Sequence, residues 1–225
     1  MLYHPADRTL YLIEWADLKV ARPSDVVREN AAALSRVAAW ARDYICKPNA
    51  DVGRAGAVCP FVETSIKRGH FYLSVCADPH VSVERASDRL SRYSDWFPEI
   101  EPRSEPGSQF KTILNLFPQP NVAGVSLIME TVRARLKASF VARGLMIGEF
   151  HPGPPRQPGL WNSEFRPLAS PVPLLGIRHM VPSDFPFLQN DARLVSEYVK
   201  RFANEVPDHL REQVHEAVSR FEVHV

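Results

Sequence analysis

The chain has 225 residues and a net charge of +1, and 27 basic against 26 acidic side chains exclude a surface-wide positive field that would attract nucleic acid. Hydrophobic residues make up 45% and charged residues 24%, which is typical of a packed domain, and the length suits a single domain over residues 1–225. No apolar run approaches the roughly 18 residues of a membrane span, and no signal sequence is recognisable, so we expect a cytoplasmic protein.

The first third of the chain predicts one helix, a short helical segment and at least one strand. Residues 1–22 alternate apolar and charged side chains, as in a strand or an N-terminal arm. From Ser24, a good N-cap residue, apolar groups recur at helical spacing as far as Ile45. A short helical segment can begin at Pro60, and the FYLSV that follows it has the β-branched and aromatic content of a strand.

The remaining two thirds interleave helices and strands. Residues 82–96 have helical spacing, and so do residues 125–140, whose far face carries Arg133, Arg135 and Lys137. Three apolar segments are predicted strands: FKTILNLFP, LMIGEF and LLGIRHMV. Two further helices are expected over 191–206 and 208–221. The pattern predicts an α+β domain, with helices packed on a mixed sheet and a helical pair at the C-terminus.

Residues 145–188 form the expected functional region. They hold nine of the chain's 20 prolines, together with aromatic residues, two histidines and three arginines. Prolines fix φ and remove backbone donors, so this segment is stiffer than an ordinary polar loop. Long ordered loops of this kind usually bind something.

His151 is the strongest single candidate, because it follows a predicted strand and opens a Pro-Gly loop. Its imidazole could bind a metal or a haem iron, act as a general base, or tie the loop to nearby backbone. Arg156, Arg166 and Arg178 offer planar cationic donors for carboxylates, phosphates or haem propionates. Their alternative role is to brace the loop.

Two other chemistries are open. His151 with His179 and either Glu149 or Asp184 could form a two-histidine, one-carboxylate iron site. Cys59 could be a thiolate nucleophile near a histidine, although a small buried thiol is the more usual state. The cysteines form no C-x-x-C pair, and the chain has no phosphate-binding, dinucleotide-binding, serine-hydrolase or zincin motif.

Three segments in this order resemble the YqcI/YcgG family, which includes haem-dependent N-oxygenases. They are VCPFVETSIKRGHFYLSV, MIGEFHPGPPR and LWNSEFRPL, and the second places Arg156 five positions after His151, the first residue of a His-Pro pair. The chain is still more similar to an uncharacterised bacterial family with an HPGPP and FRPLxSPxP pattern.

The first resemblance implies haem b with His151 as the iron ligand, and with Arg156 and either Arg166 or Arg178 near the propionates. It also implies an apolar lining that includes Phe150, Trp161, Phe165, Leu174 and Met180. The expected function is a haem-dependent oxygenase or oxidase of a small nitrogen-containing metabolite in natural-product biosynthesis. Its expected partners are that substrate and O₂ or peroxide, with a homodimer as an allowed assembly. The alternatives are a cofactor-free ligand-binding or pathway-accessory protein and a non-haem iron enzyme.

Overall fold

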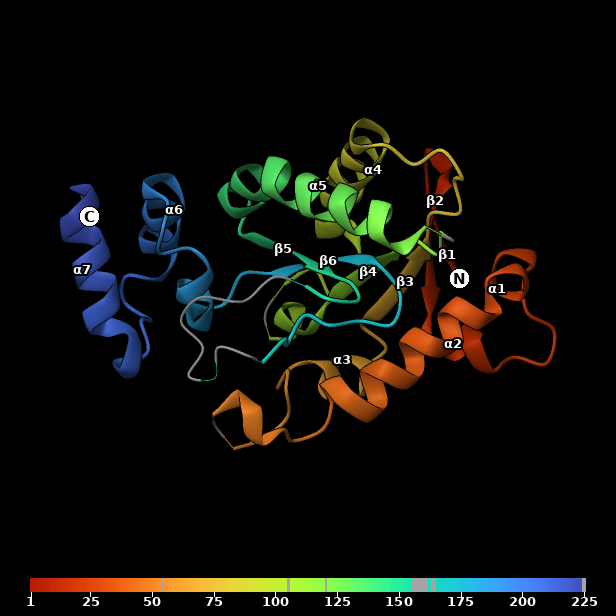
Figure 1. Ribbon diagram of the computed structural model, residues 1–225, viewed down its shortest axis with the longest axis horizontal. Helices are drawn as coiled ribbons and strands as arrows, with labels where there is room; N and C mark the ends of the chain where they lie inside the picture. Colours follow the sequence, from red (N-terminus) through yellow and green to blue (C-terminus); the bar gives the residue numbers. More distant parts are fainter. Residues whose placement is uncertain (54, 105, 120, 155–161, 163–164, 224–225) are drawn as a thin grey trace.

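The computed structural model describes residues 1–53, 55–104, 106–119, 121–154, 162 and 165–223. They form a mixed sheet in the order β1-β2-β3-β4-β6-β5, so β5 is an edge strand (Figure 1). Strands β3 and β4 run parallel, and the other neighbours run antiparallel. The strands are β1 (Leu2–His4), β2 (Asp7–Glu14), β3 (Phe71–Val75), β4 (Thr112–Leu116), β5 (Leu145–Phe150) and β6 (Leu174–His179).

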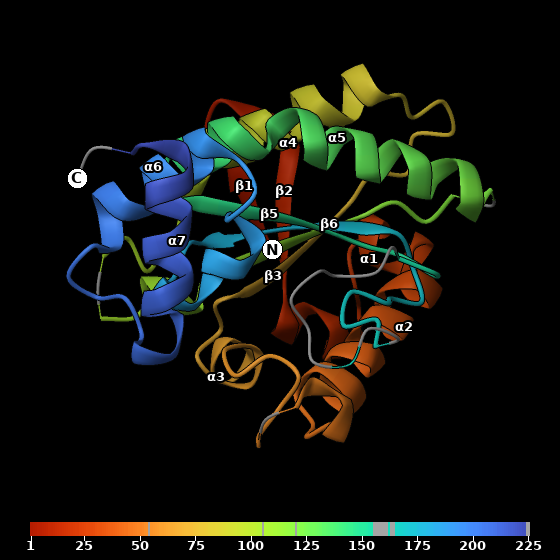
Figure 2. The ribbon, with the colours of Figure 1, turned by 60° about the vertical axis from the view of Figure 1, so that its left-hand side comes forward.

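Helices cover both faces of this sheet, which confirms the predicted α+β class. Helices α1, α2 and α3 lie against one face, and α4 and α5 lie against the other, while α6 and α7 pack beside α5 and β5 (Figures 1 and 2). None of the described helices is both long and apolar enough to cross a lipid bilayer. The helices are α1 (Asp25–Glu29), α2 (Ala31–Trp40), α3 (Val62–Lys67), α4 (Val83–Trp96), α5 (Val122–Ala142), α6 (Ala192–Phe202) and α7 (Arg211–Phe221).

The N-terminal residues are part of the sheet. Strands β1 and β2 form a hairpin, and Ile13 of β2 pairs with Leu73 of β3. Leu10, Leu12 and Ile13 are buried, because alternate side chains of β2 reach each face of the sheet. Of the two interpretations of residues 1–22, the strand is therefore confirmed for residues 2–4 and 7–14.

The helix predicted from Ser24 to Ile45 is divided. Ser24 caps α1 as expected, since its side chain accepts from Val27 N–H, but α1 ends at Glu29. The Asn30 side-chain amide donates to the Val26 carbonyl oxygen at 2.9 Å, and such local bonds compete with helix continuation. The chain resumes as α2 and then continues in a π-helical segment, Ala41–Ile45.

Strands β5 and β6 form where LMIGEF and LLGIRHMV predict them within residues 145–188, and the 3-10 helix Pro182–Phe187 follows β6. Their register pairs Leu145 with His179 at one end and Phe150 with Leu174 at the other. Gly148 lies opposite Gly176 at the middle of the ladder. Paired residues point to the same face, so both glycines face the side of the sheet that carries α2 and α3.

Candidate ligand cavity at the edge of the sheet

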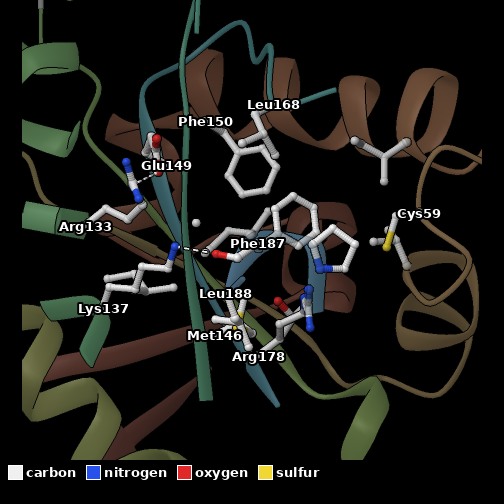
Figure 3. A pocket seen from close by; sticks show the side chains of 18 of the residues that line it. Cys59, Arg133, Lys137, Met146, Glu149, Phe150, Leu168, Arg178, Phe187 and Leu188 are labelled. Atoms are coloured by element: carbon white, nitrogen blue, oxygen red, sulfur yellow. Dashed lines mark hydrogen bonds and ion pairs between the residues drawn. The ribbon is translucent and has the colours of Figure 1, made fainter. Parts of the chain in front are cut away.

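A cavity of about 660 Å³ lies at the β5 edge, and its size is within the range typical of small-molecule sites. It extends over the β4–β6–β5 surface and past the edge of β5 to α5 (Figure 3). Most of its lining is apolar and comes from α2, the sheet and the segment before α6. The main apolar residues are Trp40, Phe71, Leu114, Met146, Phe150 and Leu188.

Gly148 and Gly176 form the floor of the cavity. A Cβ atom on Gly148 would lie 3.2 Å from Phe150 Cε2, and one on Gly176 would lie 3.2 Å from both Phe150 Cε2 and Leu114 Cδ2. These approaches are tighter than ordinary van der Waals contact, so side chains here would displace the Phe150 ring. Glycine within a strand often marks such a close approach.

An ion pair joins α5 to β5 at one wall of the cavity. Arg133 Nε lies 2.5 Å from Glu149 Oε2, and the Glu149 side chain is only 3% exposed. Burial raises the pKa of Glu149, while the Arg133 charge opposes that rise. The pair brings charge to the cavity edge but leaves little net charge there.

Lys137, one turn further along α5, lines the same wall (Figure 3). Its Nζ donates to the Phe187 carbonyl oxygen at 2.7 Å, and no described carboxylate accepts a hydrogen bond from it. Burial lowers the pKa of Lys137, and so does the neighbouring Arg133, while Glu149 and Asp191 act in the opposite direction. Lys137 is therefore a partly buried cation bonded to a neutral group.

Arg178 lines the opposite part of the cavity, and its hydrogen-bond partners are groups of the protein itself. Its guanidinium donates to Asp184 Oδ2 at 2.7 Å and to Asp184 Oδ1 at 2.5 Å, and it also donates to the His179 carbonyl oxygen. Asp184 belongs to the 3-10 helix Pro182–Phe187, so this pair fastens that helix to β6. The Tyr198 hydroxyl of α6 donates to the Pro182 carbonyl oxygen at 2.6 Å.

His151 follows β5 as predicted, but it does not line the cavity. It is 2% exposed, and its side chain points to the α5 side of the sheet because it alternates with Phe150. Its Nε2 lies 3.1 Å from Glu130 Oε1, and its Nδ1 lies 3.2 Å from the Pro152 carbonyl oxygen. The Glu130 carboxylate thus lies where Nε2 would have to meet a haem iron. In this arrangement His151 does not fit the role of a haem ligand.

The other expected haem contacts are dispersed. Arg156 and Trp161 lie outside the described residues. Phe165 is buried, and the Arg166 guanidinium donates to the Phe165 carbonyl oxygen at 3.2 Å. Arg178 lines the cavity on the face away from His151, so the structure does not bring these two residues together.

The structure also separates the residues of the expected non-haem iron site. His179 pairs with Leu145, whereas His151 follows Phe150, so the two histidines are roughly 20 Å apart along the strand. The His179 ring packs on Phe97 with 5.0 Å between ring centroids. Within the described parts of the chain, no group of three or more His, Cys, Asp or Glu residues could hold a metal ion.

Cys59 does line the cavity, on the side opposite Lys137 (Figure 3). Its expected role as a nucleophile requires a nearby histidine as base, and none of the described histidines lines the cavity. The Cys59 N–H donates to the Ile45 carbonyl oxygen at 3.0 Å, which joins this segment to the end of the α2 region. We therefore assign Cys59 to the cavity wall.

No sequence pattern pointed to Lys137, Phe187 or the glycine pair as site residues. A signal for the glycines was present, because each lies near the middle of an apolar strand, where glycine weakens the strand. Lys137 gave no such signal, since a lysine on an amphipathic helix is usually solvated.

The fold and the cavity define a single α+β domain with a ligand-sized cavity at a sheet edge. The chain belongs to the family described as Domain of unknown function (DUF6875), whose model matches residues 34–213. The chain matches no curated protein and no solved structure.

Proposed function

We propose that the protein binds a small molecule that has an apolar body and a carboxylate. The observation that carries this proposal is a cavity with an apolar glycine floor and, on its α5 wall, a cation that no described carboxylate neutralises through a hydrogen bond. An apolar body would cover the floor beside Phe150, and the carboxylate would accept from Lys137. This corresponds to the cofactor-free alternative, with Lys137 in place of the expected arginine cluster.

The neighbouring charges favour an anion at Lys137 over a second cation. The Arg133 and Arg178 guanidinium groups each have a carboxylate partner, Glu149 and Asp184 respectively. Lys137 donates instead to a backbone carbonyl, and a carboxylate acceptor would add a Coulombic attraction to this cation that a neutral acceptor lacks. An anionic ligand would therefore gain more at Lys137 than at either arginine.

The Lys137→Met variant should bind 3-phenylpropionate about tenfold more weakly than the wild-type protein, because it loses one charge-assisted hydrogen bond. Isothermal titration calorimetry at neutral pH measures this difference. In the wild type, binding should also weaken at alkaline pH. Burial lowers the pKa of free Lys137 and a bound carboxylate raises it, so affinity is lost as pH rises through that range.

The matched control is Lys137→Arg, which keeps its charge at alkaline pH and should flatten the pH dependence. A second variant, Gly148→Val, should crowd Phe150 and weaken binding without changing any charge. Equal affinities of Lys137→Met and the wild type would remove Lys137 from the site, and no binding by the wild type would overturn the proposal.

The haem-dependent oxygenase implied by the family resemblance is a separate proposal with its own test. Haem ligation through Nε2 of His151 would require the Glu130 carboxylate to leave its present contact. We expect any such binding to give a Soret band that disappears in His151→Ala while the far-ultraviolet circular dichroism is retained. Protein that takes up no added haemin would contradict the oxygenase proposal and leave the carboxylate proposal unaffected.

A further inference from the structure

The open edge of β5 offers backbone hydrogen-bonding groups to the cavity. Met180 N–H donates to the Gly144 carbonyl oxygen at 2.9 Å, in register with the β5–β6 ladder. In an antiparallel ladder, bonded pairs alternate with non-bonded pairs, so Gly148 bonds toward β6. The backbone N–H and C=O groups of Ile147 and Glu149 therefore point away from β6.

The contacts of His151 support this orientation. Its N–H donates to the Leu168 carbonyl oxygen, and its own carbonyl oxygen accepts from Ser170 N–H, each at 3.3 Å. The segment around Ala169 thus runs beside the outer edge of β5, in a parallel bridge with His151. At this point, the outer edge of β5 therefore already bonds another segment of the same protein.

Nearer the middle of β5, the edge is not covered by described residues. The Glu149 carboxylate bonds its own backbone N–H. No described residue outside the ladder bonds the backbone N–H or C=O of Ile147. The Ile147 side chain is 3% exposed and packs in the core on the α5 side, so the backbone of Ile147 is the part that faces the cavity.

A donor and an acceptor on one residue call for a ligand group that offers both in return. One extended amino-acid residue does so, because its N–H and its C=O point to the same side, and extended peptides bind open sheet edges in this way. A buried backbone group without a partner costs free energy comparable to a lost hydrogen bond, so an amide ligand gains by pairing with it. Lys137 lines the cavity beside this edge, and it supplies the cation for a carboxylate close to the amide.

We propose that the cavity binds an N-acylated α-amino acid. Its amide N–H donates to the Ile147 carbonyl oxygen, its carboxylate accepts from the Ile147 N–H and from Lys137, and its apolar side chain covers the floor at Gly148 and Gly176. The inference rests on the proposed function, because both place the carboxylate at Lys137. It adds the amide and thereby names the chemical class of the ligand.

The test compares three probes by calorimetry on the full chain. N-acetyl-L-phenylalanine should bind about tenfold more tightly than 3-phenylpropionate, which has the ring and carboxylate without the amide. It should also bind more tightly than its N-methyl derivative, which lacks the amide donor. Equal affinities for the three would overturn the amide inference and leave the carboxylate proposal standing, whereas no binding by any probe would overturn both.

Hydrogen exchange at single amides gives a second readout that uses the unaltered protein. In the free protein, the Ile147 amide should exchange faster than the Gly148 amide, which bonds toward β6. Added N-acetyl-L-phenylalanine should slow exchange at Ile147 by about tenfold or more, and 3-phenylpropionate should slow it less, because it lacks the amide N–H that holds the carboxylate against this edge. An Ile147 amide that is already protected in the free protein, or that does not respond to the amide ligand, would exclude pairing at this edge.

Discussion

Asp184→Ala is expected to lower the free energy of unfolding by about 3–5 kcal/mol, the usual loss when one partner of a buried ion pair is removed. The Asp184 side chain is 3% exposed and accepts two hydrogen bonds from the Arg178 guanidinium. It also accepts from the Val181 N–H at 2.8 Å. The variant leaves the Arg178 charge partly buried and an N–H group unbonded, and urea denaturation measures the loss.

Asp191→Ala is the matched control, because Asp191 also lines the cavity and also accepts backbone hydrogen bonds. Its carboxylate caps α6 by accepting from the N–H groups of Arg193 and Leu194. Loss of such a cap costs about 1 kcal/mol. An Asp184→Ala variant no less stable than Asp191→Ala would show that the Arg178 pair does not fasten the 3-10 helix.

Arg133→Met should cost about 3 kcal/mol at neutral pH, at the lower end for a buried ion pair because the Arg133 side chain is 30% exposed. The variant leaves the buried Glu149 carboxylate without its cation. Burial already raises the pKa of Glu149, and the loss of Arg133 raises it further. The folded variant then binds a proton more tightly than the unfolded chain, so the deficit is full above the raised pKa and shrinks as pH falls through it.

A double-mutant cycle with Glu149→Gln separates this ion pair from the packing of the two side chains. When residue 149 is neutral, Arg133→Met should cost much less, with a coupling of about 0.5–3 kcal/mol between the two sites. Strictly additive losses, or a deficit of the single variant that does not change between pH 4 and pH 7, would contradict the assigned role of Arg133. Urea denaturation across that pH range provides both measurements.

The sequence predicted most of the fold because its strongest signals are local. The segments FYLSV and LMIGEF have the apolar composition of buried strands, and the residues from Val125 to Phe140 have helical spacing. The division of the first helix was missed because it depends on one side-chain bond, from Asn30 to the Val26 carbonyl oxygen. Sheet order could not be derived, since the strand neighbours of β4 come from distant parts of the chain.

The candidate site was harder to predict because it depends on which side chains meet across elements. Arg133 and Lys137 were expected on the solvated face of a helix. In the structure this face of α5 lies beside the edge strand β5, so both side chains line the cavity. Arg178 was expected to bind an anionic ligand group. It instead forms an ion pair with Asp184, which lies six residues later in a 3-10 helix. His151 does follow its strand as predicted. The alternation of side chains along β5 places it on the α5 face of the sheet, away from the cavity floor.

The hydrogen bond from Tyr198 to Pro182 affects how a ligand could enter the cavity. It joins α6 to the 3-10 helix that carries Phe187, so this wall belongs to the C-terminal helical unit and the floor belongs to the sheet. The same helix is held to β6 by the Arg178–Asp184 pair, so its local opening would break that pair while the central strands stay intact. Ligand entry would then depend on the stability of this one wall, and a bound ligand would protect the 3-10 helix and α6 from proteolysis.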